Sequence, residues 1–137
     1  MPRGRGRDLS SFEARGIIFD TSFLLEAIRT PGAFTFMEEL FGDLPFYVPE
    51  SVVDELRRIS NRRRGVKPRR ARLILNYIEK GRFKKLTSKS DKADIDIEML
   101  ATEGRYIVAT GDSKLRESLA DAGVKIIYLK DGYPHIV

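Results

Sequence analysis

Residues 16–25, with the sequence GIIFDTSFLL, place an aspartate directly after a short apolar run. Residues 17–19 predict a buried strand, because three consecutive apolar residues fit a strand that is covered on both faces. Residues 23–29 predict a helix that ends near Pro31. Asp20 therefore stands at the carboxyl end of a strand, which is where open α/β sheets build their sites.

The rest of the sequence alternates short apolar runs with amphipathic segments of helix length. This alternation predicts an α/β fold, in which parallel strands are joined by right-handed crossovers and helices cover both faces of the sheet. We expect further strands at residues 46–48, 83–86, 106–109 and 125–129, further helices at 34–40, 49–59, 69–80, 91–103 (capped by Ser90 or Asp91) and 113–121, and a tail at 131–137.

The chain of 137 residues is long enough for one domain with its own core. We expect the polar, Gly- and Arg-rich residues 1–14 to form a flexible basic tail and residues 15–137 to form the single domain. The absence of cysteine excludes disulfides, zinc–thiolate sites and thiol catalysis. No apolar run approaches the roughly 18 residues of a membrane span, and none follows the basic start as in a secretory signal. We therefore expect a cytoplasmic protein with no membrane contact.

The formal net charge of +5 is concentrated in one segment. Residues 57–72, RRISNRRRGVKPRRAR, hold nine basic residues and no acid. Such a run fits a solvated face or a surface for an acidic partner, but its density favours a clamp on the phosphates of a nucleic acid. Nothing in the segment indicates readout of base edges. The candidate RNA-binding residues are Arg57, Arg58, Arg62, Arg63, Arg64, Lys67, Arg69, Arg70 and Arg72.

Four acids stand at junctions of the predicted strands and helices: Asp20, Glu55, Asp94 and Asp112. If the strand at 106–109 lies beside the first strand, Asp112 becomes a neighbour of Asp20. Crowded carboxylates raise one another's pKa, and a bound divalent cation relieves the repulsion. Ligands that are all oxygen suit Mg²⁺ or Mn²⁺. Such an ion could activate water against a phosphodiester bond.

Each of these acids also has an ordinary structural interpretation. Aspartates before a helix commonly act as N-caps, and a glutamate on an exposed helix face commonly pairs with a neighbouring base. Taken together at these junctions, the four favour a shared metal site. Asp96, on the same predicted helix as Asp94, either supports that site or faces solvent. The lone His135 is expected to be an exposed residue of the tail.

With these motifs the sequence resembles the PIN-domain ribonuclease family, over about residues 16 to 130. The family has an Asp-Thr or Asp-Ser pair after the first strand and a glutamate in the helix after the second strand. It then has an aspartate that is followed by an apolar residue three positions later and a small residue seven positions later. Its last motif is a strand that runs into Thr-x-Asp. The matching segments are DTSFLL at 20–25, Glu55 in VPESVVDEL, Asp94 with Ile97 and Ala101, and ATGD at 109–112.

The resemblance implies a three-layer α/β/α sandwich like that of flap nucleases. It also implies a Mg²⁺- or Mn²⁺-dependent endoribonuclease, a hydrolase whose metal ligands are the four acids. Asp96, Thr110 and Ser22, which stands where the family often has Asn, are expected to support the metal site. Residues 48–56 and 106–119 are more similar to the PIN endonucleases of small-subunit ribosomal RNA processing and their archaeal relatives than to the VapC-like toxins.

Other interpretations remain open at this point. A toxin would have an antitoxin as partner, whereas an RNA-processing enzyme would have a ribosome-assembly partner. A non-catalytic RNA-binding protein with a PIN-like fold would need no metal. A receiver-like domain also collects aspartates at strand ends, but it typically has an acidic pair at the first strand, where this chain has Phe19 and Asp20. The apolar residues at 34–41 fit a homodimer interface or the core equally well.

Overall fold

A computed structural model describes residues 14–137 of the chain. The tail expected at residues 1–14 thus lies outside the described residues, apart from Ala14. Within the described part, six strands form one sheet in the order β3-β2-β1-β4-β5-β6. All neighbouring strands are parallel except β5 and β6. The strands are β1 (Ile17–Phe19), β2 (Phe46–Pro49), β3 (Lys84–Leu86), β4 (Ile107–Ala109), β5 (Ile126–Lys130) and β6 (Tyr133–Ile136).

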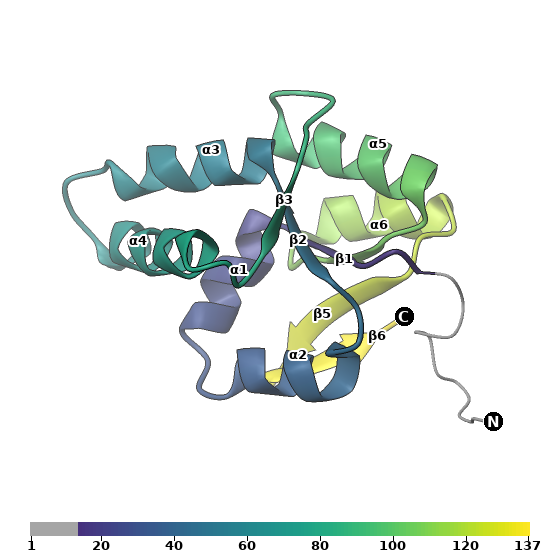
Figure 1. Ribbon diagram of the computed structural model, residues 1–137, viewed down its shortest axis with the longest axis horizontal. Helices are drawn as coiled ribbons and strands as arrows, with labels where there is room; N and C mark the ends of the chain where they lie inside the picture. The colour runs from purple at the N-terminus through teal and green to yellow at the C-terminus, as the bar shows by residue number, and fades with distance from the viewer. Residues whose placement is uncertain (1–13) are drawn as a thin grey trace.

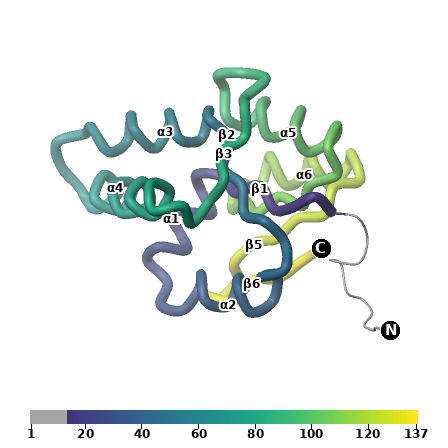
Figure 2. The backbone as a smooth tube through the Cα atoms, in the orientation of Figure 1, coloured from purple at the N-terminus to yellow at the C-terminus, as the bar shows by residue number. Residues whose placement is uncertain are grey.

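Helices surround this sheet as the alternating sequence pattern predicts (Figure 1). The helices are α1 (Thr21–Ile28), α2 (Ala33–Phe41), α3 (Glu50–Ser60), α4 (Val66–Glu79), α5 (Ala93–Gly104) and α6 (Ser113–Asp121). Helices α5 and α6 pack together, whereas α1 contacts both α2 and α4. Figure 2 shows the chain leaving α3, turning at residues 61–65 and returning along α4. The α/β class with a mainly parallel sheet is confirmed.

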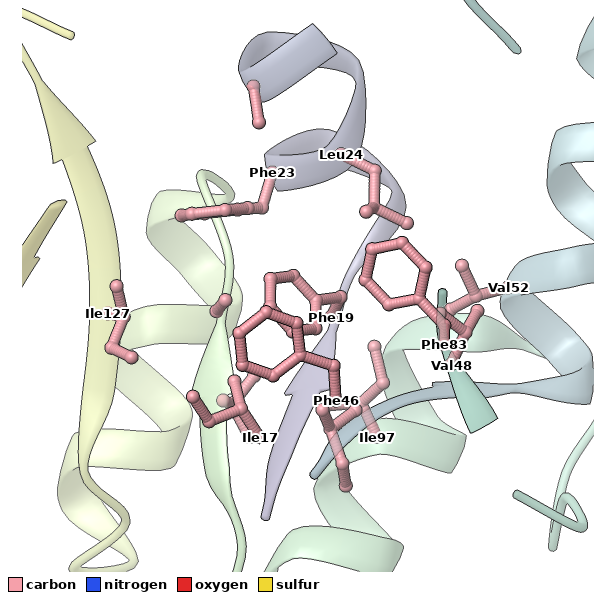
Figure 3. Packing of buried hydrophobic residues seen from close by; sticks show 14 of the residues in the cluster. Ile17, Phe19, Phe23, Leu24, Phe46, Val48, Val52, Phe83, Ile97 and Ile127 are labelled. Carbon is pink, nitrogen blue, oxygen red and sulfur yellow. The ribbon is translucent and has the colours of Figure 1, made fainter. Parts of the chain in front are cut away.

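The core forms around the aromatic side chain that precedes Asp20. The Phe19 side chain is fully buried, and its ring lies 5.0 Å from that of Phe46 and 5.2 Å from that of Phe83 (Figure 3). The Phe23 ring of α1 packs against Phe19 at 5.6 Å. Aromatic pairs at these spacings add to the stabilisation from apolar burial. The end of β1 is therefore anchored from both β2 and α1.

Most element boundaries lie within two residues of the sequence prediction, and two parts of the chain differ by more. The segment at 131–137 is not a tail but contains the antiparallel strand β6, because Asp131 and Gly132 both take positive φ (53° and 83°) and form a tight hairpin turn after β5. An Asp-Gly pair is a typical signal for such a turn. Helix α4 begins at Val66 rather than Arg69, since Pro68 lies in its first turn, where proline is tolerated.

Two further predictions concern α5 and α2. The N-cap of α5 is Lys92 without a side-chain hydrogen bond, so the expected cap by Ser90 or Asp91 is wrong. Most apolar residues of α2 pack within the domain, and Leu40 keeps 58% of its surface exposed. Nowhere in residues 14–137 does a helix have the length and apolar character needed to cross a bilayer.

Candidate active site

All four predicted acids line one pocket at the carboxyl edge of the sheet. Its cavity volume is about 350 Å³, and its walls include Thr21, Ser22, Leu25, Ile59, Lys67 and Ala93 in addition to Asp20, Glu55, Asp94 and Asp112. Four different elements supply the acids: the end of β1, helix α3, the first turn of α5 and the loop after β4. The topology gathers them because α3, α5 and α6 each follow a parallel strand at the same edge.

Parallel pairing of β1 with β4 sets the position of the first acid. Phe19 is in register with Ala109, and the Asp20 N–H donates to the Ala109 carbonyl over 2.9 Å. Asp20 is therefore level with Thr110, the first residue after β4. The Thr110 hydroxyl donates to Asp20 Oδ2 over 2.7 Å, and the Ser22 hydroxyl donates to the same oxygen over 3.0 Å.

The two hydroxyl groups also connect Asp20 to the turn that leads into α6. Ser22 Oγ accepts the N–H of Gly111 over 3.0 Å, and Thr110 Oγ1 accepts the N–H of Asp112 over 3.1 Å. The carboxylate of Asp20 and the backbone before α6 thus share the same partners. Movement of either segment would break hydrogen bonds of the other.

Thr21 links Asp20 to the acid of α3. Its backbone N–H donates to Asp20 Oδ1 over 2.8 Å, while its hydroxyl donates to Glu55 Oε1 over 2.6 Å. Thr21 is buried, and its bond to Asp20 lies away from bulk water, whereas its bond to the half-buried Glu55 is partly buried. One residue therefore orients two of the four carboxylates. The sequence prediction did not assign Thr21 a role, although it follows Asp20 in the motif.

Burial dominates the ionisation of Asp20. Only 7% of the residue is exposed, and desolvation raises the pKa of its carboxyl group above the ordinary value of 3.8. The hydrogen bonds from Thr110, Ser22 and Thr21 act in the opposite direction, and the negative charge of Glu55 raises the pKa further. The net shift of the pKa is upward, so ionisation of Asp20 lowers the stability of the fold.

The other two acids lie at the N-terminal ends of helices, and only Asp112 is an N-cap as its ordinary interpretation suggested, whereas Asp94 lies in the first turn of α5. Asp112 is the N-cap of α6, and its Oδ1 accepts the N–H groups of Lys114 (2.9 Å) and Leu115 (3.3 Å). Asp94 Oδ1 accepts the N–H of Ile95 over 2.9 Å. In both residues, these backbone bonds use only Oδ1. No donor within residues 14–137 bonds to Oδ2 of Asp94, Oδ2 of Asp112 or Oε2 of Glu55.

The donor set suits a hard divalent cation, because it consists of carboxylate oxygens without nitrogen or sulfur. Within the described residues, however, no three His, Cys, Asp or Glu side chains lie close enough together to hold an ion as they stand. Asp94 and Asp112 are exposed and Glu55 is half-buried, so these side chains have room to change rotamer. The pocket has the ligand atoms that such an ion prefers. The acidic side chains would have to move closer together when the ion binds.

Asp96 does not line this pocket, although the sequence grouped it with the supporting residues. It is fully buried, and its carboxylate accepts the hydroxyls of Ser51 (2.5 Å) and Ser88 (2.6 Å) and the N–H groups of Lys89 (2.6 Å) and Ser90 (3.3 Å). These bonds fasten the loop before α5 to α3. Their effect on the pocket is indirect, since Asp96 lies two residues after Asp94.

The nine basic candidates do not all line the acidic pocket. Of these nine, all of which the structure describes, Lys67 alone lines the acidic pocket. Arg57 pairs with Asp54 over 3.6 Å, and Arg72 donates to the Ser60 carbonyl over 2.7 Å, which ties α4 to the end of α3. The others lie on the turn at residues 61–65 and on exposed parts of α3 and α4.

A family model described as a PIN-like domain matches residues 17–132, which is most of the chain. The chain belongs to the PIN-like domain family. The fold of this PIN-like domain is similar to that of the PIN domain endonuclease Utp24, with a TM-score of 0.70 and 21% identity over 88% of this chain and 90% of that one.

A second similar structure is a domain of a functionally unknown protein from Methanocaldococcus jannaschii. Its TM-score is 0.58 and its identity 21%, over 85% of this chain and 92% of that one. No curated protein matches the sequence. Membership in the PIN-like family supports a nuclease activity for this domain, and the two likenesses support the fold.

Replacing Asp20 by Asn should stabilise the PIN-like domain at pH 7 in the presence of EDTA. The fold prefers the neutral carboxyl, so ionised Asp20 lowers the free energy of unfolding above its raised pKa. The gain should shrink as the pH falls toward 3.8, where the unfolded state also becomes protonated. Thermal unfolding of both proteins at several pH values measures the difference in stability. Asp112→Asn is the matched control, because Asn caps a helix as well as Asp. A variant less stable than wild type at pH 7 would refute the cost assigned to burial.

Replacing Asp96 by Ala should lower the free energy of unfolding by about 3 kcal/mol, because two hydroxyls and two N–H groups lose a charged acceptor in a buried place. Urea unfolding measures the change. Asp91→Ala is the control, since Asp91 is exposed in the same loop and should change stability by no more than about 0.5 kcal/mol. Equal losses from the two substitutions would contradict the anchoring role.

Proposed function

We propose that this PIN-like domain is a divalent-metal-dependent endoribonuclease that hydrolyses phosphodiester bonds of RNA. The observation that carries the proposal is the convergence of four carboxylates, from four separate elements, on one pocket at the carboxyl edge of a parallel sheet. Four isolated caps or surface charges would have no reason to share a cavity. Membership in the PIN-like family supports the same chemistry.

Mg²⁺ or Mn²⁺ is the proposed cofactor, held by Asp20, Glu55, Asp94 and Asp112. When bound, such an ion polarises a phosphodiester and makes a coordinated water a stronger nucleophile. The carboxylate oxygens of Glu55, Asp94 and Asp112 that have no partner among the described residues support this assignment. The raised pKa of Asp20 supports it too, because a nearby cation favours the ionised form that burial disfavours.

The residues of the chain would prepare the site before the substrate arrives. Ser22 and Thr110 fix one oxygen of Asp20, and Thr21 fixes the other together with Glu55. Rotation of these carboxylates is thereby restricted, which reduces the ordering that the reaction itself requires. Asp94 and Asp112 are held only through backbone N–H groups and are exposed, so they are the ligands that would adjust.

RNA is the proposed substrate class. The net charge of +5 and the basic segment at 57–72 would neutralise backbone phosphates. The preference for RNA rests on the resemblance of residues 48–56 and 106–119 to PIN endonucleases of ribosomal RNA processing, which also makes ribosomal RNA the favoured target. The similar structure is itself that of a PIN domain endonuclease.

The direct test is an RNA cleavage assay with Mn²⁺ and a labelled RNA that contains single-stranded and paired segments. Wild type should cleave in Mn²⁺ and not in EDTA, and Asp20→Asn should lose at least about 100-fold in rate, because a ligand charge is removed with little change of volume. RNA affinity should be retained. Asp121→Asn, at the far end of α6, should cleave like wild type. Equal cleavage by wild type and Asp20→Asn would contradict the proposal, and RNA binding without any cleavage would favour a non-catalytic RNA-binding protein.

A further inference from the structure

Lys67 is the basic side chain of the acidic pocket. It lies in the first turn of α4 and shares the pocket with the four acids and with the apolar side chains of Leu25 and Ile59. We propose that Lys67 binds a phosphate group of the RNA inside the pocket and holds it beside the carboxylates. This assignment rests on the proposed nuclease function, and it separates Lys67 from the other basic residues of the 57–72 segment.

The charge of Lys67 is available to a ligand. Ion pairs between residues 14–137 join Arg29 with Glu26, Arg57 with Asp54, Arg82 with Glu38 and Lys89 with Glu103. None of these involves Lys67 or an acid of the pocket. Among the described residues, the ammonium group thus shares a cavity with four carboxylates and forms a direct ion pair with none of them.

The position of Lys67 on α4 fits its place in the pocket. The buried residues of α4 are Pro68, Ala71, Ile74 and Ile78, and Lys67 precedes the last three at the helical spacing of four, three and four residues. Lys67 is exposed and leaves the helix on the same side as these core residues, at the end where the pocket opens. Arg69 and Arg72 line a different hollow of the surface, together with Leu73 and Asn76.

The start of α4 is fixed in place. Gly65 precedes the helix with φ +114°, a conformation that L side chains rarely adopt, and Pro68 is buried in the first turn. Arg72 adds a hydrogen bond of 2.7 Å to the Ser60 carbonyl across the α3–α4 turn. These features hold the turn of α4 from which Lys67 projects.

A phosphate is the ligand class that fits this environment. The four acids repel a phosphodiester. Cations bound by these acids would attract the phosphodiester, but only next to the carboxylates. A lysine ammonium elsewhere in the same cavity adds attraction at a second point, and its flexible stem lets it follow a phosphate as a point charge. The apolar surfaces of Leu25 and Ile59 in the same wall suit the methylene stem.

The experiment compares Lys67→Met, which keeps the apolar stem without the charge, with Lys67→Arg, which keeps a charge, and with Lys80→Met at the opposite end of α4 as the matched control. Single-turnover cleavage of RNA in Mn²⁺ should slow at least about 10-fold for Lys67→Met, be largely retained in Lys67→Arg and be unchanged in Lys80→Met. Thermal unfolding of each variant verifies the fold, which an exposed position should preserve.

A second measurement does not depend on cleavage. Hexauridylate is titrated into ¹⁵N-labelled protein in EDTA, and the backbone amides of Ser22 and Gly111 at the pocket are followed by NMR. For wild type these amides should shift on binding, and the slope of log Kd against log salt should fall by about 1 for Lys67→Met. Lys80→Met should leave the shifts at the pocket as in wild type.

The outcomes separate the two proposals. If wild type cleaves and Lys67→Met cleaves equally fast, the role of Lys67 is overturned and the nuclease proposal stands. If wild type fails to cleave but the pocket shifts depend on Lys67, the phosphate site stands without the nuclease. If wild type fails to cleave and hexauridylate binding is unaffected by Lys67→Met, both are overturned.

Discussion

The parallel pairing of β1 with β4 is the contact on which the site depends. It places Asp20 level with Thr110, so that one carboxylate at the end of the first strand receives a hydroxyl that is 90 residues away in the chain. β1 is central in the sheet, where strands are added toward β2 on one side and toward β4 on the other. Crossovers leave in opposite directions from this point, and ligand sites in open α/β sheets form there. The same pairing is held by the core, since Phe19 precedes Asp20 and packs against Phe23, Phe46 and Phe83.

Electrostatic interactions among the acids of the pocket lower the stability of the fold and favour the binding of a cation. Burial of Asp20 raises the pKa of its carboxyl group, and the charge of Glu55 adds to that cost, while three donors reduce it. Thr21 connects the two acids, because it bonds to Asp20 through its N–H and to Glu55 through its hydroxyl. A pocket that only needed to be stable would not keep acids in this arrangement. A divalent cation would reverse the balance, since it favours the ionised form of each acid.

Much of the fold and the acidic pocket could be predicted from the sequence, because each acid stands where an apolar strand ends or a helix begins. The order of the first elements follows from that pattern, whereas the proximity of Asp20 and Asp112 also required the pairing of β1 with β4, which the structure shows. Other features depend on contacts that no local pattern encodes. Asp96 resembles a site residue in the chain but is used by Ser51 and Ser88 in a separate network. Lys67 could not be distinguished from the other eight bases in the sequence, and only the packing of α4 places it beside the four acids.

The most direct test of the central claim is Mn²⁺ binding followed by paramagnetic broadening of backbone amides in ¹⁵N-labelled protein. If the four acids share one ion, low concentrations of Mn²⁺ should broaden the amides around the pocket, those of Ser22, Ile95 and Gly111 among them, while the amide of His135 on β6 stays sharp. Broadening that starts at exposed acids elsewhere, such as Glu103 or Asp121, and leaves the amides at the pocket unaffected would contradict a shared metal site.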